Sequence, residues 1–248
     1  MSNLSFINSP FFDFGSINQI SSLLKNYDIK KPLICTDPGI SSSTLLDDLR
    51  NNISNEYSPS FFKDTPANPT EEAVEKAVEK YKTEGCDGII GFGGGSSLDL
   101  AKAVSLMSTH SGSLAKYSPN EGGMEKIGQT SPHIAIPTTS GTGSEVSSGA
   151  VIIMNDGRKL VLISKELIPV AAICDPHLTL GLPPRMTAGG GMDALTHCIE
   201  AVLSPVIDPP AEGVGLDGIE KVVREGNLIK AVQDGTDKEA RWNMMMAA

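Results

Sequence analysis

Short apolar runs typical of buried strands alternate with segments of helical periodicity through most of the chain. The strand-like runs lie at residues 31–37, 89–92, 133–137 and 171–175, and the helix-like segments lie at residues 41–50, 70–81 and 98–107. Strand and helix patterns that take turns in this way are typical of α/β folds. The alternation therefore predicts an α/β domain.

The segment at residues 70–81 shows the helical signals most fully. Thr70 can cap its N-terminus, and Glu71 and Glu72 stand in the first turn, where the helix dipole favours carboxylates. One apolar stripe follows at helical spacing, made of Ala73, Val74, Ala77, Val78 and Tyr81. We expect an amphipathic surface helix.

The character of the chain changes near Leu182. Before it, residues 151–154 and 159–163 flank an Asn-Asp-Gly-Arg turn and predict a β-hairpin. Beyond the two prolines at 183–184 the strand-like runs stop, and a helix that we expect the glycines at 189–191 to open carries the next apolar pattern. We expect two domains, residues 1–182 and residues 183–248.

Charge and composition exclude several classes of partner. The chain of 248 residues has 30 acidic and 20 basic side chains, a formal charge of −10. A surface of this sign is not built to neutralise nucleic acid or anionic lipid. No apolar run approaches the roughly 20 residues of a bilayer span, and residues 1–10 lack a signal-peptide pattern, so the expected location is the cytoplasm. The four cysteines form no C-x-x-C pair and are expected to be reduced core thiols.

A glycine-rich loop, Gly93-Gly94-Gly95-Ser96-Ser97, joins a strand-like run to a helix-like one. Backbone amides and a helix N-terminus at such a position favour an anion, so the loop is a candidate phosphate cradle. The loop matches neither the general dinucleotide fingerprint nor the P-loop. A tight turn without a ligand is the alternative.

A second polar loop follows the strand-like run at residues 133–137. It reads Thr138-Thr139-Ser140-Gly141-Thr142-Gly143-Ser144-Glu145 in the sequence. Open α/β sheets bind ligands at the carboxyl ends of their strands, where these hydroxyls could bond a nucleotide. A serine-rich surface loop is the alternative.

Asp37 also follows a strand-like run. It could accept hydrogen bonds from a ribose diol and repel a 2′-phosphate, or it could simply form the turn before Pro38-Gly39.

Asp193 and His197 lie four residues apart in a helical segment and so share one face. A carboxylate and an imidazole suit Fe(II) or Zn(II). A hydrogen bond between two surface side chains is the alternative. We expect structural roles for His110, His133 and His177.

Four motifs in order resemble the iron-dependent (group III) alcohol dehydrogenases. They are Gly-Gly-Gly-Ser-Ser-Leu-Asp-Leu-Ala-Lys102, Ile-Pro-Thr-Thr-Ser-Gly-Thr-Gly-Ser-Glu145, Asp-Pro176 and Gly-Met-Asp-Ala-Leu-Thr-His-Cys-Ile-Glu200. The resemblance implies a Rossmann-like dinucleotide-binding domain, an all-helical domain like that of dehydroquinate synthase, and a catalytic cleft between them. It also implies a homodimer or larger homo-oligomer.

The resemblance assigns a role to each matching residue. Asp37 would bind the ribose and choose the cofactor, Asn68 would lie beside the cofactor, and Gly94, Gly95 and Ser96 would meet the pyrophosphate. Thr138 and Thr139 would lie near the adenine half, Thr142 and Ser144 near the nicotinamide, and Val151 and Lys159 along the cofactor channel. Asp193 and His197 would be the first two metal ligands.

Two departures qualify the resemblance. The family takes two more histidine ligands from later helices, which would fall beyond Ala248, so we expect a half-present metal site. We also expect an incomplete helical domain with uncovered apolar faces, which include Met244-Met245-Met246. Gly190 stands where the family usually has a bulkier small residue, which could loosen the start of the helix.

We therefore predict a metal-dependent oxidoreductase that transfers hydride between NAD(H) and a small alcohol or aldehyde, with Fe(II), or alternatively Zn(II), polarising the alcohol oxygen. Two alternatives stay open: a non-catalytic NAD-binding module, and a metal-free reductase of the maleylacetate type.

Overall fold

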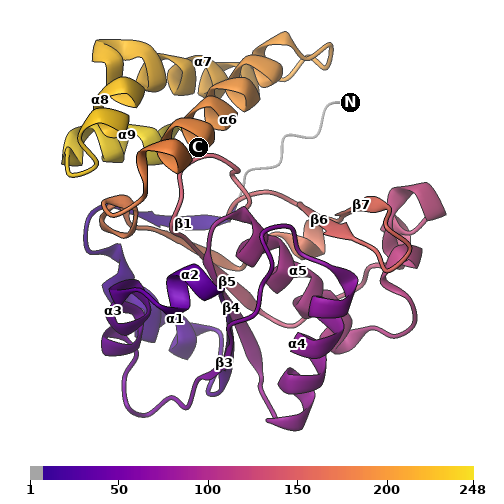
Figure 1. Cartoon of the computed structure of the whole chain (residues 1–248). Coiled ribbons are helices and arrows are strands. Elements are labelled where there is room, and N and C mark those ends of the chain that lie inside the picture. The colour runs from indigo at the N-terminus through magenta and orange to yellow at the C-terminus, as the bar shows by residue number, and fades with distance from the viewer. Residues whose placement is uncertain (1–7) are drawn as a thin grey trace.

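The structure is a computed structural model and describes residues 8–248, so most of the N-terminal segment examined for a signal peptide lies outside it. Its centre is a six-stranded sheet in the order β1-β8-β5-β4-β2-β3, in which every neighbouring pair is parallel (Figure 1). The strands are β1 (Ser9–Phe12), β2 (Pro32–Cys35), β3 (Ser60–Phe62), β4 (Gly88–Gly93), β5 (His133–Pro137) and β8 (Ala171–Cys174). The predicted α/β class is confirmed.

Helices cover both faces of this sheet. They are α1 (Ile20–Asn26), α2 (Pro38–Ser41), α3 (Thr44–Asn52), α4 (Glu71–Thr83) and α5 (Gly95–Thr109). Ile89 of β4 belongs to the apolar cluster beneath α4 and α5, whereas its neighbour Ile90 belongs to the cluster beneath α1 and α3. Successive side chains of a strand point to opposite faces, which is why the central strand is apolar at both positions.

Several local predictions are confirmed. The Thr70 hydroxyl accepts the N–H of Ala73 and caps α4, and all five residues of the predicted stripe are buried. The expected hairpin is formed by β6 (Gly149–Ile153) and β7 (Lys159–Ile163), which pair antiparallel outside the main sheet. All four cysteines are free and buried.

Beyond Leu182 the described chain is helical. It forms α6 (Pro184–Leu203), α7 (Pro209–Val223), α8 (Asn227–Gln233) and α9 (Lys238–Ala247), which lie together above the carboxyl edge of the sheet (Figure 1). Short 3-10 helices complete the structure: η1 (Ser16–Gln19), η2 (Leu114–Tyr117), η3 (Pro119–Glu121), η4 (Met124–Lys126), η5 (Lys165–Leu167), η6 (Pro176–Thr179) and η7 (Arg224–Gly226). Within residues 8–248, no helix has both the length and the apolar character needed to cross a bilayer.

The start of α6 corrects the expectation that the glycine run opens this helix. The helix begins at Pro184, so all three glycines lie inside it, where each costs up to about 1 kcal/mol of helix stability. A methyl group on Gly191 would lie 2.2 Å from Leu228 and 2.9 Å from Met244. Close packing of α6 against α8 and α9 therefore explains why residue 191 is a glycine. The sequence pattern did not reveal this packing.

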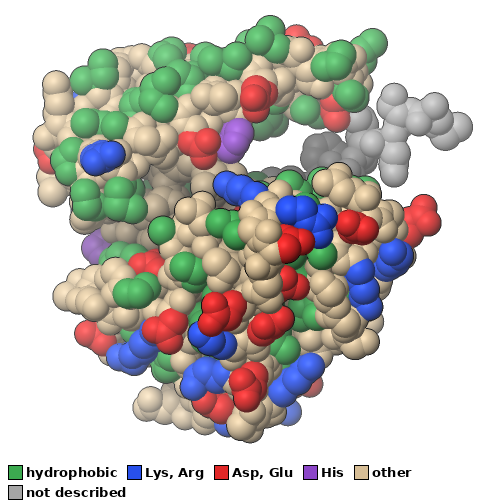
Figure 2. All heavy atoms as spheres, turned by 45° about the vertical axis from the view of Figure 1, so that its right-hand side comes forward, with side chains coloured by type: hydrophobic (Ala, Val, Ile, Leu, Met, Phe, Trp, Pro, Cys, Tyr) green, Lys and Arg blue, Asp and Glu red, His purple; other side chains and the backbone are tan. Residues whose placement is uncertain are grey.

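The methionines of α9 are a second correction. Met244 and Met245 are buried, the latter beside Phe12 and Cys174, and only Met246 is substantially exposed. Most of the exposed large apolar side chains of the helical part lie instead on α6, α7 and the loop between them, and Figure 2 shows hydrophobic groups over this part. The most exposed are Leu203, Val206, Ile207 and Val214.

Replacing Asp175 with alanine should destabilise the α/β part. The side chain is fully buried after β8, and its two oxygens accept the N–H groups of Ile17 at 3.1 Å and His177 at 3.0 Å. Unpaired buried donors cost about 1–3 kcal/mol, so urea unfolding should show a loss of that size. Glu79→Ala, on the exposed face of α4, should change the free energy of unfolding by less than about 0.5 kcal/mol. Equal losses in the two variants would contradict the role assigned to Asp175.

Candidate functional site

Three segments that the sequence analysis singled out meet at one edge of the sheet. Asp37 follows β2, the glycine loop (residues 93–97) follows β4, and the threonine loop (residues 138–148) follows β5. Because β5, β4 and β2 are adjacent and parallel, their carboxyl ends lie side by side (Figure 1). This edge faces the helical part, where α/β sheets place their ligands.

Asp37 forms the turn before Pro38-Gly39, which was the alternative to a cofactor role. Only one of its two carboxylate oxygens takes part in this turn. Its Oδ1 accepts the N–H groups of Gly39 at 2.8 Å and Ile40 at 3.0 Å, which caps α2. Its Oδ2 faces the glycine loop, since a methyl group on Gly93 would lie 3.1 Å from it. One oxygen thus remains directed toward the candidate cradle.

The glycine loop leaves a backbone-lined space at the start of α5. Gly93 has a φ of +150° and leaves no room for a side chain, because a methyl group there would lie 2.6 Å from the Ser97 Oγ. Helix α5 begins at Gly95, two residues into the predicted tight loop, and no side chain caps its N-terminus. The end of this 15-residue helix is therefore open to an anion, as the cradle hypothesis requires.

The threonine loop lies directly against the glycine loop. The Thr138 N–H bonds the Gly93 carbonyl at 3.0 Å, a methyl group on Gly94 would touch the Thr139 side chain at 3.4 Å, and one on Gly95 would lie 2.6 Å from Thr142. The Ser96 hydroxyl bonds the carbonyl of Ala67, which places exposed Asn68 beside the same loop.

Three of the eight buried side-chain polar atoms that lack a hydrogen-bond partner in residues 8–248 lie in this region. Among the described residues, the buried hydroxyls of Thr36, Ser97 and Ser140 have no hydrogen-bond partner. Buried polar groups are normally paired, and these three belong to the segments that surround the cradle. Hydroxyls without partners beside an uncapped helix N-terminus and a side-chain-free loop fit a polar, anionic ligand such as a dinucleotide.

Asp99 and Lys102 of α5 are polar residues of this region that the sequence analysis left without a role. The Asp99 carboxylate accepts the Ser144 hydroxyl at 2.6 Å and the Val151 N–H at 2.9 Å. Burial raises the pKa of Asp99 and lowers the pKa of Lys102 to about 8. A signal was present, since both charges interrupt a helix that is otherwise apolar on this side.

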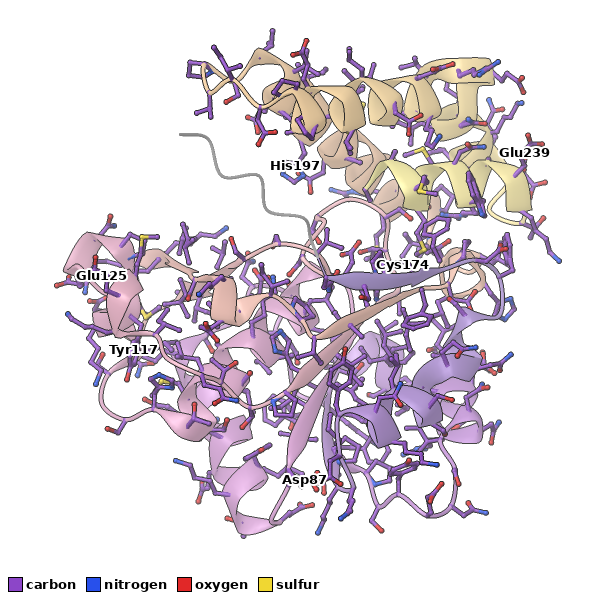
Figure 3. The ribbon with its side chains drawn as sticks, turned by 180° about the vertical axis from the view of Figure 1, so that it is seen from behind. Asp87, Tyr117, Glu125, Cys174, His197 and Glu239 are labelled. Atoms are coloured by element: carbon purple, nitrogen blue, oxygen red, sulfur yellow. The ribbon has the colours of Figure 1, made fainter. Side chains whose placement is uncertain are left out.

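The candidate metal pair stands on α6. The Nε2 of His197 lies 3.8 Å from the Oδ1 of Asp193, and both side chains are about half exposed. Figure 3 shows His197 on the side of α6 that faces the α/β part. No group of three or more histidine, cysteine or acidic side chains is placed to share a metal within residues 8–248, so this pair could supply two donors at most. An accessible carboxylate and imidazole one turn apart fit such a metal ion.

The other three histidines differ in their surroundings. Buried His133 lies on β5, and desolvation lowers its pKa to about 3. His110 packs edge-on against Tyr117 and accepts the Gly128 N–H at its Nε2. His177 is exposed at η6.

Gly190 joins α6 to the threonine loop. A methyl group on Gly190 would lie 2.7 Å from the Ser140 carbonyl oxygen, and one on Gly141 would lie 2.7 Å from the Gly190 carbonyl oxygen. The two backbones are in contact here. Gly190 lies inside α6 and not at its start, and it permits the close approach that brings the helix bearing Asp193 and His197 onto the candidate cofactor loop.

Comparisons with known proteins agree with this arrangement. The family model for iron-containing alcohol dehydrogenase matches residues 9–176, and the model for the C-terminal part of the Fe-containing alcohol dehydrogenase family matches residues 187–248. The chain belongs to the iron-containing alcohol dehydrogenase family.

Its relatives are longer than the chain. It is 44% identical to a 4-hydroxybutyrate dehydrogenase of Cupriavidus necator over 100% of the chain and 64% of that relative. It is 39% identical to long-chain-alcohol dehydrogenase 1 of Geobacillus thermodenitrificans over 93% of the chain and 58% of that protein. The chain thus spans less than two thirds of either relative.

Solved structures of the family share the fold. A 1,3-propanediol oxidoreductase superposes with a TM-score of 0.91 at 30% identity, covering 99% of this chain and 64% of that one. An alcohol dehydrogenase from Oenococcus oeni gives a TM-score of 0.93 at 28% identity, with the same two coverages. The Rossmann-like and helical parts expected from the sequence are therefore those of this family.

Gly95→Val and Thr139→Val should each weaken the binding of NADH. A side chain at Gly95 would press on Thr142 and fill the mouth of the cradle, while valine at 139 removes a hydroxyl but keeps the shape. Fluorescence titration should show a dissociation constant raised about tenfold, equivalent to about 1.4 kcal/mol. Gly181→Val, where a methyl group meets nothing within 4 Å, is the matched control and should bind as wild type does. Unchanged titrations for both site variants would remove the cradle from consideration.

Proposed function

We propose that the chain forms the cofactor-binding and metal-anchoring part of an oxidoreductase that transfers hydride between NAD(H) and a small alcohol or aldehyde. One observation carries the proposal: the backbone contact between Gly190 and the threonine loop puts Asp193 and His197 on a helix that rests on the candidate cofactor site. A cofactor and a metal-bound substrate must lie next to each other for hydride to pass between them, and this helix would place them so. The division into residues 1–182 and 183–248 is part of the same proposal.

The chain's own residues would bind the cofactor in a defined direction. The helix α5 N-terminus, with Gly94, Gly95 and Ser96, would face the pyrophosphate. Asp37 would bind the adenosine ribose through the oxygen that does not cap α2, and Thr138 and Thr139 would bond the same half. The nicotinamide would then point toward α6, beside Thr142 and Ser144, with Val151 and Lys159 lining the channel.

Asp193 and His197 would hold Fe(II), with Zn(II) as the alternative ion. When bound, the ion would act as a Lewis acid on the alcohol oxygen. The carboxylate and the imidazole would hold that ion on the side of α6 that faces the α/β part. This pair is also what favours the metal-dependent function over a metal-free reductase or a module that only binds NAD.

The substrate is proposed as a small primary alcohol or its aldehyde. The relative of 44% identity is described as a 4-hydroxybutyrate dehydrogenase, so a 4-hydroxy acid is the first compound to assay. We further propose a cytoplasmic enzyme that assembles as a homodimer or larger homo-oligomer, without nucleic acid or membrane partners.

Asp37→Asn should relax the choice between the two nicotinamide cofactors. Asparagine keeps an oxygen that can cap α2 but removes the charge that would lie near a 2′-phosphate, where like charges cost on the order of 1 kcal/mol. The ratio of the NADPH to the NADH dissociation constant should fall about tenfold. Asp37→Gly should lower the same ratio and also weaken the cap. A wild-type protein that already prefers NADPH, or an unchanged ratio in both variants, would falsify the role of Asp37.

Asp193→Ala and His197→Ala should each weaken the binding of Fe(II). Each removes one of two donors, so anaerobic titration with a chelating indicator should show a dissociation constant raised at least about tenfold, as ligand loss generally does. His177→Ala removes an exposed imidazole far along the chain from the pair and should leave Fe(II) affinity unchanged. If all three variants bind Fe(II) alike, the metal assignment is wrong. NADH titration in parallel reports separately on the cofactor site.

A further inference from the structure

Helix α5 carries a buried lysine and a partly buried aspartate on the face that meets the threonine loop and β6. Asp99 and Lys102 are three residues apart, so they lie one turn apart on one side of the helix. Lys102 is only 1% exposed, which is rare for a lysine. Both side chains reach into residues 144–151, which end the threonine loop and begin β6.

Every N–H of the Lys102 ammonium group is engaged by that segment. Its Nζ donates to the carbonyl oxygens of Ser147 at 2.8 Å and Gly149 at 2.7 Å, and to the Ser147 hydroxyl at 3.0 Å. An ammonium group has three donors and no acceptor, so this set is complete. Hydrogen bonds from a charged donor are also the stronger kind.

Asp99 secures both ends of the same segment. One oxygen accepts the Ser144 hydroxyl and the other accepts the Val151 N–H. Together the two side chains fix residues 144–151 at four positions from one helix face. The helix that does this is the helix whose N-terminus forms the candidate pyrophosphate site.

We propose that Lys102 and Asp99 are positioning residues that hold residues 144–151 in the shape that receives the nicotinamide half of the cofactor. Lys102 itself would not contact the cofactor. The inference rests on the proposed function. Asp37 and the glycine loop define the adenosine and pyrophosphate end, and α6 with its metal pair contacts the threonine loop at Gly141. The nicotinamide must therefore lie on the α6 side, beside the segment that the two charges hold.

The surroundings of Lys102 give the arrangement a pH dependence. Asp99 faces it from its own helix, Glu145 from the threonine loop and His133 from β5, and Lys159 of β7 faces Asp99. Burial lowers the pKa of Lys102 to about 8, against the opposing effect of the two carboxylates, and His133 stays neutral because its own pKa is lowered to about 3. The ammonium is present below that pH and lost above it. Deprotonation replaces one donor with a lone pair among three oxygen acceptors.

The test compares two ligands that differ only in the nicotinamide. NADH and ADP-ribose are titrated into wild type, Lys102→Met and Asp99→Asn, with Lys82→Met on the exposed side of α4 as the matched control. Lys102→Met should raise the NADH dissociation constant about tenfold or more, as expected for loss of a charged hydrogen-bond donor, and the ADP-ribose constant less than about twofold. Asp99→Asn should shift NADH in the same direction by a smaller factor. Thermal unfolding shows whether each variant folds. If Lys102→Met does not fold, the Asp99→Asn titrations test the inference.

The pH profile supplies a readout that a purely structural role would not move. In wild type, the ratio of the NADH to the ADP-ribose dissociation constant should rise between pH 7 and pH 9.5, and in Lys102→Met it should be flat. Equal weakening of both ligands in the variants, or a pH-independent ratio in wild type, overturns the inference while leaving NAD binding intact. If wild type binds neither ligand, the proposed function fails and this inference fails with it.

Discussion

A parallel sheet buried on both faces leaves one place where polar chemistry is free to occur, namely the carboxyl edge of its central strands. Here β4 and β5 present Ile89, Ile90, Ile134 and Ile136 to apolar clusters above and below, so apart from His133 their polar residues lie in the loops that follow. The glycine loop and the threonine loop are those continuations. Their contact follows from strand order, because adjacent parallel strands end together.

The class of fold and the identity of both loops were accessible from the sequence because the signals are local. Periodicity, the Thr70 cap and the Asn-Asp-Gly turn act within a few residues, and each predicted its element correctly. The short strands β1 and β3 gave no such signal. They lie at the two edges of the sheet and are recognisable chiefly by their neighbours, since β1 pairs only with β8 and β3 only with β2.

The candidate site shows the same division between local and distant causes. Asp37, the glycine loop and the Asp193–His197 pair stood out by residue type and spacing. The charges of Asp99 and Lys102 in an apolar helix were visible too, but their role was not, because it lies in partners more than forty positions away, at Ser144, Ser147 and Val151. The close packing at Gly190 was missed for a related reason: the effect of a glycine in a helix depends on what approaches it, and the Ser140 carbonyl comes from another part of the chain.

The contact between Gly190 and the threonine loop has a mechanical consequence. Side chains at an interface absorb small displacements by changing rotamer, but two backbones in van der Waals contact cannot adjust in this way. A shift of α6 toward the sheet would be transmitted undiminished to Ser140 and Gly141, and the tolerance for sequence change at the junction is correspondingly narrow. Variation in the outer helices α7 and α8 would alter how firmly α6 is supported, while the approach of α6 itself to the threonine loop would still be limited by the contact of Gly190 with Ser140 and Gly141.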